Sequence, residues 1–334
     1  MRPCCKRYPG ARFNRLAGCV MAAILLSTAA LVHAEQAFPS KPVRLIVPFA
    51  AGGGTDLIAR TVGDAMSRDL GQAIIVENKP GGGTVIGSEA VAKSAPDGYT
   101  LLIATFAHAA NPALVAKLPY LTEKAFAPVV LIGSSPNVLV VRADKPWKSV
   151  SEVVAAARAS PGKFSFGSQG NGTSAHLAGA LFENLARVEL IHVPYKGAGP
   201  AITDLLGGQI DMMFATVSAV SQLIESGKLR ALAVTTTDRS PALAGVPTLA
   251  EAGVAGYAAE SWYGIYVAAG TPREVIARLN LSIRRAVQTE AFRKRIGDEG
   301  LVANVGTPED LDRYVRGEEA RWRRLIKEEH ISID

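Results

Sequence analysis

A run of three glycines follows a short apolar stretch within residues 44–56, RLIVPFAAGGGTD. Residues 45–47 are typical of a buried strand, because a short β-branched run bounded by turn residues suits a covered sheet. The glycines at 52–54 let the backbone approach a ligand closely, and we expect Thr55 or Asp56 to cap the helix that follows. Free N–H groups at such a strand–loop–helix junction can bind an anion without a charged side chain. The stretch therefore predicts an anion site.

Comparable glycine-rich loops occur at 81–83, 167–172 and 197–199. One such loop is more often only a tight strand-to-helix turn, but the recurrence of the pattern favours a shared binding function. The chain contains neither the G-x-G-x-x-G dinucleotide fingerprint nor a glycine followed at phosphate-loop distance by Lys-Ser/Thr. The pattern therefore argues against a dinucleotide-dependent enzyme.

Polar side chains in these loops each have two interpretations. Asp56 either caps its helix or receives a ligand ammonium group or an ordered water. Ser168, Thr173 and Ser174 offer hydroxyl donors, but each is equally suited to capping a helix. The sequence leaves these alternatives open.

Aromatic and basic residues near the predicted loops could complete a cleft. Tyr195 and Lys196 follow a predicted strand, where a phenol and an ammonium group can reach a ligand, although Lys196 is equally suited to a solvated surface. Phe49, Trp262 and Tyr263 could line the same cleft, with core packing as the default for each.

The histidines do not form a recognisable catalytic pattern. His108, His176, His192 and His330 are widely dispersed, H-E-x-x-H is absent, and no Ser/His/Asp spacing surrounds His176. A lone histidine such as His176 more often packs or donates a hydrogen bond than catalyses a reaction. These observations argue against a hydrolase and predict neither a metal site nor a cofactor.

The first 34 residues are typical of a signal peptide, with a basic leader, an apolar core at 20–32 and small residues before a cleavage site near Ala34. The apolar core is shorter than a membrane-spanning helix requires, and a lipid attachment at Cys19 is disfavoured because the residue precedes that core. All three cysteines, Cys4, Cys5 and Cys19, lie in the leader, so no disulfide is expected after cleavage. Five of the 36 Lys and Arg residues but none of the 30 Asp and Glu residues lie there too, so the exported chain is nearly neutral and nucleic acid is not an expected partner.

Strand and helix patterns alternate along the remaining 300 residues, which predicts an α/β fold with mainly parallel strands. Two halves each present three loops at strand ends, and ligands of open α/β sheets bind beyond such ends. Asn111-Pro112 is expected to close the third loop of the first half. A single helix is expected over 272–297 and a last helix over 307–327. We expect domain 1 to comprise 35–139 and 262–334, and domain 2 to comprise 140–261.

The ordered strings FPSKPVRLIVPFAAGGGTD, VENKPGGGTVIGSEAVAKSAPDGYTLL, FGSQGNGTSAHLAGALF, VPYKGAGPAITDLLGGQIDMMF and GVPTLAEAG resemble one family closely. It is the family of solute receptors of tripartite tricarboxylate transporters, the Bug-type periplasmic binding proteins, and the resemblance covers essentially all of the exported chain. The resemblance implies a two-domain, type II-like periplasmic-binding-protein fold with mainly parallel sheets and a ligand cleft between the domains. It implies no enzymatic activity.

The resemblance implies that the site binds a small carboxylate through backbone amides, hydroxyl groups and waters. The residues assigned to that binding by position are Phe49, Ala51, Gly53, Gly54, Asp56, Thr84, Thr105, Ser168, Gly170, Thr173, His176, Tyr195, Lys196 and Ala215.

Departures from the family pattern leave the ligand's identity open. Family members often have Pro at the position of Ala51 and Asp at the position of Ala215. At the positions of Thr84 and Val85 they often have Gly and a polar residue. Loss of a carboxylate at Ala215 disfavours an ammonium-bearing ligand. The resemblance further implies a periplasmic monomer that delivers its ligand to membrane permease subunits, and the alternative is a receptor that presents its closed form to a membrane signalling protein.

Overall fold

The computed structural model describes residues 38–297 and 300–328 together with Met1 and Ile331. The chain divides into two units, Met1–Ser40 and Lys41–Asp334, and all that follows concerns the second. The predicted signal peptide lies outside the described residues, apart from Met1. No helix among the described residues combines the length and apolar character needed to cross a membrane.

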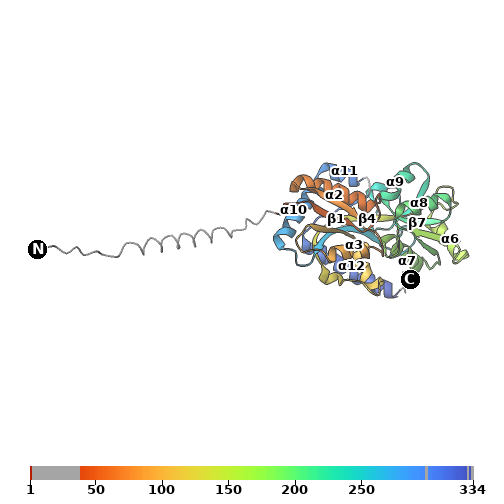
Figure 1. Ribbon diagram of the computed structural model, residues 1–334. Coiled ribbons are helices and arrows are strands. Elements are labelled where there is room, and N and C mark those ends of the chain that lie inside the picture. Colours follow the sequence, from red (N-terminus) through yellow and green to blue (C-terminus); the bar gives the residue numbers. More distant parts are fainter. Residues whose placement is uncertain (2–37, 298–299, 329–330, 332–334) are drawn as a thin grey trace. The chain divides into compact units, whose positions relative to one another are not determined.

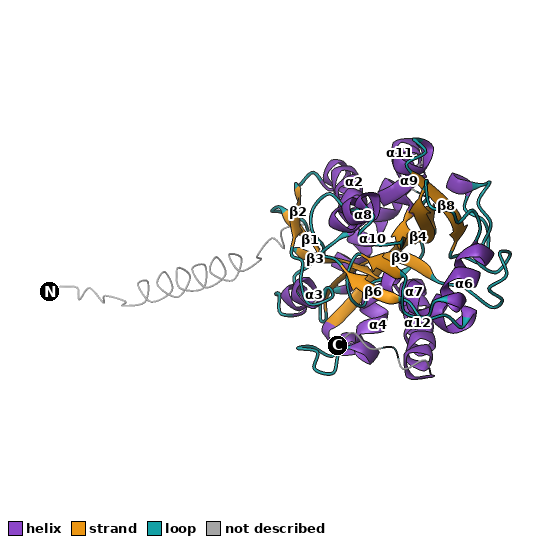
Figure 2. Cartoon of the chain, turned by 90° about the vertical axis from the view of Figure 1, so that its right-hand side faces the viewer, coloured by secondary structure: helices purple, strands orange, loops and turns teal. Residues whose placement is uncertain are grey.

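Three parallel strands form one end of the sheet, in the order β2, β1, β3. They are β1 (Val43–Val47), β2 (Ile74–Asn78) and β3 (Thr100–Thr105), and β9 (Glu260–Ala268) pairs antiparallel with β3. Their helices are α2 (Gly54–Leu70), α3 (Val85–Ala92) and α4 (Phe106–Leu114). Figures 1 and 2 show α2 and α3 on opposite faces of these strands. We call this part of the molecule the first lobe.

The other end of the sheet repeats this pattern in the order β7, β5, β6, again with parallel pairing. These strands are β5 (Ser165–Ser168), β6 (Ile191–Pro194) and β7 (Met212–Thr216). The helices of this part are α6 (Val150–Ala159), α7 (Ser174–Ala186), α8 (Ala198–Gly207) and α9 (Val217–Glu225). Its apolar core includes Phe166, Phe182 and Phe214, which are fully buried. We call this part the second lobe.

One strand of 17 residues, β4 (Phe126–Arg142), runs through both lobes. It pairs antiparallel with β9 as far as Pro136, and from Asn137 onward it pairs antiparallel with β7 and β8 (Leu229–Val234). The sequence here has two short apolar runs typical of separate strands, VVLIG at 129–133 and VLVV at 138–141, whereas the structure has one continuous strand with register shifts against β9. The α/β prediction is confirmed, but the strands that join the lobes are antiparallel rather than parallel.

The C-terminal segments differ from prediction in one respect. The single helix expected over 272–297 is divided into α10 (Arg273–Gln288) and α11 (Glu290–Gly297), because Thr289 has an extended backbone and its side chain accepts a hydrogen bond from Phe292 N at 3.2 Å. The chain continues through β10 (Val302–Ala303), which pairs with β4, to α12 (Pro308–Glu328). The remaining helical turns are α5 (Thr122–Ala125) and η1 (Pro241–Leu243).

The end of α12 joins the core of the second lobe. Trp322 and Ile326 of α12 lie in the same buried cluster as Phe182, and the Trp322 ring packs edge-on against Phe106 of α4 with centroids 4.6 Å apart. The lobes therefore share packing in addition to strands. The domain boundaries at 139/140 and 261/262 stay a prediction.

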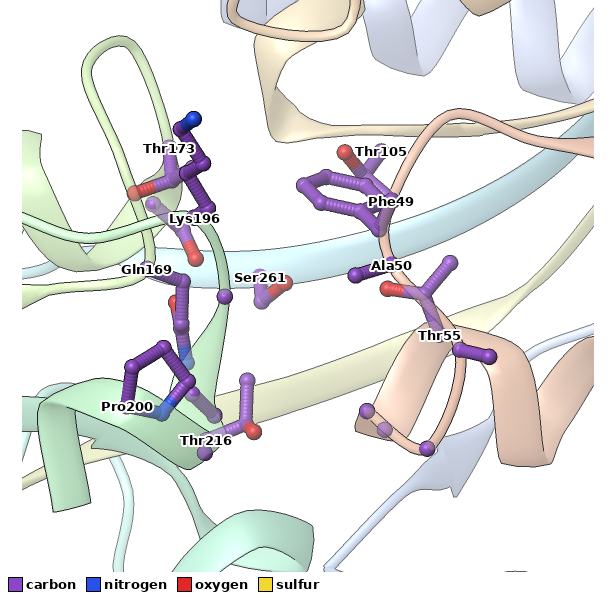
Figure 3. A pocket seen from close by; sticks show the side chains of 18 of the residues that line it. Phe49, Ala50, Thr55, Thr105, Gln169, Thr173, Lys196, Pro200, Thr216 and Ser261 are labelled. Atoms are coloured by element: carbon purple, nitrogen blue, oxygen red, sulfur yellow. The ribbon is translucent and has the colours of Figure 1, made fainter. Parts of the chain in front are cut away.

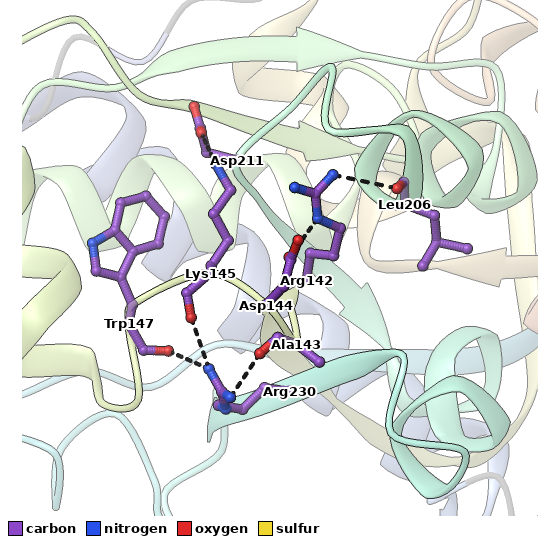
Figure 4. Close-up of polar contacts among 8 residues, drawn as sticks. All are labelled: Arg142, Ala143, Asp144, Lys145, Trp147, Leu206, Asp211 and Arg230. Carbon is purple, nitrogen blue, oxygen red and sulfur yellow. Dashed lines mark hydrogen bonds and ion pairs between the residues drawn. The ribbon is translucent and has the colours of Figure 1, made fainter.

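Arg230 of β8 fixes the chain that leaves β4 and leads to α6. Its guanidinium donates to the carbonyl oxygens of Lys145 at 3.1 Å, Trp147 at 2.8 Å and Ala143 at 2.7 Å (Figure 4). Arg142, in contrast, donates to the exposed Asp144 and makes only a long contact of 3.5 Å with a backbone carbonyl.

We expect Arg230→Met to lower the free energy of unfolding by about 2–3 kcal/mol, since the apolar stem is kept while three partly buried carbonyls lose their donor. Arg230→Lys should recover part of this loss, because one ammonium cannot reproduce the planar fork. Urea unfolding measures the effect. Arg142→Met is the matched control, with an expected loss under about 1 kcal/mol, and equal losses in the two variants would contradict the interpretation.

Candidate functional site

A pocket lies between the two lobes at the ends of the parallel strands. Its cavity volume is about 160 Å³. Figure 3 shows the first-lobe side chains, including Phe49 and Thr105, facing second-lobe side chains, including Gln169 and Thr216, with Ser261 of β9 between them. The lining residues are Phe49, Ala50, Ala51, Gly52, Gly53, Gly54, Thr55, Thr105, Gln169, Thr173, Ser174, Lys196, Gly197, Ala198, Gly199, Pro200, Thr216, Ser261 and Tyr263.

Several helices begin at this pocket. Among the described helices, the N-cap residues of α2, α4, α7, α8 and α9 all line it, namely Gly53, Thr105, Thr173, Gly197 and Thr216. Only α7 has a side-chain cap among these, because the Thr173 hydroxyl accepts from His176 N at 3.4 Å. The first turns of the other four have backbone N–H groups that no capping side chain satisfies, and helix dipoles add partial positive charge there. The pocket is therefore suited to an anion.

Lys196 is the one residue with a formal charge among the described residues that line this pocket. Its side chain is exposed and comes from the loop before α8. Acidic side chains are absent from that lining, so the charge of the wall is positive and small.

Asp56 organises the first loop rather than facing the pocket. Its carboxylate accepts hydrogen bonds from Gly52 N at 3.0 Å, Arg60 Nε at 3.0 Å and Asn78 Nδ2 at 3.0 Å. Burial opposes ionisation, but these donors outweigh it and hold the pKa of Asp56 below its usual value. The prediction that Thr55 or Asp56 caps α2 is wrong, because the N-cap is Gly53 and the helix begins at Gly54.

The histidines of the second lobe are not dispersed in the folded chain. His176 of α7 and His192 of β6 stack with ring centroids 4.1 Å apart, and the Ser168 hydroxyl lies 2.7 Å from His192 Nε2. His176 Nδ1 accepts from Gly172 N at 3.2 Å, which orders the loop before α7. Burial lowers the pKa of His176 to about 4, and burial together with His176 lowers the pKa of His192 to about 3. The rings are thus neutral packing groups behind the pocket wall at neutral pH.

Tyr195 turns away from the pocket toward α8. Its hydroxyl donates to Asp204 Oδ2 at 2.7 Å, and burial together with this carboxylate raises the pKa of Tyr195 to about 12. The phenol is therefore committed within the second lobe.

The loop that carries Thr84 contacts the other lobe instead of the pocket. Residues 81–84 all have positive φ, including Thr84 at 79°, a conformation that a β-branched residue rarely adopts. Asn111 Nδ2 holds the loop by donating to Gly83 O at 2.9 Å and to Thr84 Oγ1 at 3.3 Å. A Cβ on Gly83 would lie only 3.0 Å from Asn171 O, so the two backbones pack closely. Asn111-Pro112, predicted to close a loop, lies within α4.

The predicted residues therefore fall into two groups. Those on the pocket wall are Phe49, Ala51, Gly53, Gly54, Thr105, Thr173 and Lys196. Those outside the lining are Asp56, Thr84, Ser168, Gly170, His176, Tyr195 and Ala215.

Sequence reasoning missed part of the wall. Gln169, Pro200, Thr216 and Ser261 line the pocket without having been singled out. The first three lie in or beside loops that were recognised, so the position after each strand was a usable signal. Ser261 comes from β9, and nothing in its apolar surroundings in the sequence distinguishes it.

A pocket between two α/β lobes, rimmed by helix N-termini, is the arrangement typical of periplasmic solute-binding proteins. The model of the family described as "Tripartite tricarboxylate transporter family receptor" matches residues 58–331. The chain belongs to this family.

Relatives and solved structures agree with that membership. The chain is 35% identical to protein BugT of Bordetella pertussis over 309 residues, 91% of this chain and 95% of BugT. It is similar to the periplasmic binding protein BugD, with a TM-score of 0.84, 34% identity and coverage of 88% of this chain and 99% of that one. MatC of Rhodopseudomonas palustris with bound malate has a TM-score of 0.82, 33% identity and coverage of 86% and 100%. The family and these structural neighbours are solute-binding proteins, not enzymes.

Proposed function

We propose that this protein captures a small organic carboxylate in the pocket between its lobes and delivers it to membrane permease subunits. The observation that carries the proposal is the convergence of helix N-termini from both lobes on one pocket whose wall bears a lysine and no carboxylate. Oriented N–H groups favour an anion, and they release it more easily than a buried ion pair would. The structures with bound malate and, in another R. palustris protein, adipate support the same class of ligand.

The size of the pocket supports a short acid. A cavity of about 160 Å³ is close to the size that holds one benzene molecule. Phe49 and Tyr263 offer ring surface to an apolar chain, while hydroxyl groups such as Thr105 and Ser261 offer donors and acceptors. A carboxylate with a short hydrocarbon body fits both features.

Export and domain movement complete the proposal. The family supports a periplasmic location, and we propose that residues 1–34 are a signal peptide cleaved near Ala34. We also propose that the lobes correspond to residues 35–139 plus 262–334 and 140–261, and that they close by bending where β4 changes partners. That change falls between Pro136 and Asn137.

The direct test is to purify the exported protein, identify any co-purifying acid by mass spectrometry, and screen organic acids by thermal shift. A ligand that binds only the folded protein raises its melting temperature by mass action. We expect stabilisation by carboxylic acids and none by matched amides or amines. Failure of every acid to bind would reject the proposal.

We expect Lys196→Ala to raise the dissociation constant for such an acid about 3- to 10-fold at low ionic strength, because an exposed ammonium contributes modestly to holding an anion. Calorimetric titration at low and high salt measures the effect, which should shrink as salt is added. Lys163→Ala is the matched control. Lys163 is exposed just before the N-terminal end of β5, whereas the pocket lies at the C-terminal end of that strand. A loss that is independent of salt would contradict this role.

A further inference from the structure

Asn137 is held rigidly at the point where β4 changes partners. Its backbone N donates to Thr235 Oγ1 at 2.9 Å, and its carbonyl accepts from Thr235 N at 2.9 Å. The residue has no exposed surface. The position of its backbone is therefore fixed by β4 and by Thr235, which directly follows β8.

The side-chain amide of Asn137 is only half satisfied. Its Oδ1 accepts from Ser174 Oγ at 3.4 Å, whereas its Nδ2 is buried and has no hydrogen-bond partner among the described residues. An orphaned buried donor is unfavourable, and a native protein rarely keeps one without a reason. An acceptor that is not part of the chain would remove this cost.

Asn137 adjoins two residues of the pocket wall. It is opposite Thr216 in the register of β4 and β7, and its hydrogen-bond partner Ser174 begins α7. Both Thr216 and Ser174 line the pocket, whereas Asn137 itself does not. An anion seated between these two residues, or a water that it holds, would bring an acceptor close to Asn137, which adjoins both.

We propose that Asn137 is a ligand-recognition residue whose Nδ2 donates to the captured carboxylate, directly or through one water. This inference rests on the proposed function and adds to it a residue outside the glycine-rich loops. Because β4 also joins the lobes, the same hydrogen bond connects the presence of the anion to the strand at which the lobes would bend.

The test uses Asn137→Asp, which keeps the shape of the side chain but presents an acceptor to the anion. Calorimetry with an acid that the unaltered protein binds should show affinity lowered by at least about tenfold, since a hydrogen bond to a charged group is lost and repulsion is added. The affinity should recover between pH 8 and about 5.5, as the buried aspartate takes up a proton and becomes a donor. Unaltered protein should show no such recovery.

A second variant separates recognition from a purely structural role. Asn137→Leu removes the orphaned N–H at similar volume, so we expect unchanged or higher stability together with affinity lowered about tenfold. Asn280→Asp is the control, because Asn280 is buried in α10 and donates to Val129 O at 2.8 Å and Gly306 O at 3.1 Å, away from the pocket lining. It should lower stability and leave affinity unchanged.

The possible outcomes are distinguishable. If Asn137→Asp and Asn137→Leu bind the acid as tightly as the unaltered protein, the inference is overturned and the proposed function stands. If the unaltered protein binds no acid at all, both are overturned. If Asn137→Asp does not fold, the affinity of Asn137→Leu decides.

Discussion

Gly54→Ala is expected to raise the dissociation constant for the ligand about 10- to 100-fold while leaving the melting temperature of the ligand-free protein nearly unchanged. Gly54 is the first residue of α2, and a Cβ there would overlap with Ser218 Oγ and lie 3.3 Å from Ser218 Cβ. Ser218 belongs to α9 of the other lobe, so the added methyl group separates two helix N-termini that face the same pocket. Thermal shift and calorimetry measure the two quantities.

Two further variants test whether this contact causes the loss. Ser218→Ala removes the overlapping oxygen, so Gly54→Ala combined with Ser218→Ala should recover most of the affinity, and a double-mutant cycle gives the coupling. Gly207→Ala is the matched control, because a Cβ at this helical position meets nothing within 4 Å. Unchanged ligand affinity in Gly54→Ala would show that close approach of α2 and α9 is not needed for binding.

The order of strands and helices was predictable because each element carries its own local signals. Ser149 illustrates this, since a serine three residues before a glutamate is a helix-start signal, and its hydroxyl accepts from Glu152 N at 3.3 Å at the start of α6. The glycine-rich loops were likewise recognisable. Those after β1, β5 and β6 reach the pocket, as expected because ligands of open α/β sheets bind beyond the carboxyl ends of the strands.

The joining strand was not predictable from local sequence. Residues 133–137, GSSPN, are typical of a turn, yet they form the middle of β4, where pairing with β9 overrides local preference and bulges absorb the mismatch. The break at Thr289 was missed for a different reason. Apolar periodicity continues from α10 into α11, and it obscured a threonine that is a standard helix-capping residue.

The direction of side chains limited the prediction of the site. Tyr195 follows its strand as expected, but a carboxylate on the next helix, Asp204, binds its hydroxyl within the lobe. The stacking of His176 on His192 joins two elements with no shared local pattern, so the sequence suggested dispersed residues. Ser261 reaches the pocket because it pairs with Ser135 of β4, beside the point where β4 passes from one lobe to the other, which is a consequence of topology.

Burial of histidines is expected to lower the stability of this protein in mild acid, whereas Glu183, whose pKa burial raises to about 7, acts in the opposite direction. Burial lowers the pKa of His108 to about 4, and its ring is enclosed by Tyr266 and Phe126 at centroid distances of 4.5 and 5.0 Å. Burial lowers the pKa of His176 to a similar value. In the unfolded chain a histidine titrates near 6.5, so between that value and 4 the unfolded state binds more protons. The stabilisation is complete above pH 6.5 and is lost as pH falls through this window.

The expected loss is about 2 kcal/mol at pH 5 for each of His108 and His176, with a further contribution from His192. Urea unfolding from pH 7.5 to 5 measures it. His108→Leu should reduce the slope of unfolding free energy against pH, because one proton-linked group is removed, whereas Leu279→Ala, a buried change in α10, should lower stability equally at every pH. In the folded protein His176 stays neutral until the pH approaches 4, so the hydrogen bond from Gly172 N persists and the affinity for the acid should change little between pH 7.5 and 5. A slope that His108→Leu leaves unchanged would mean that this ring titrates normally in the folded protein.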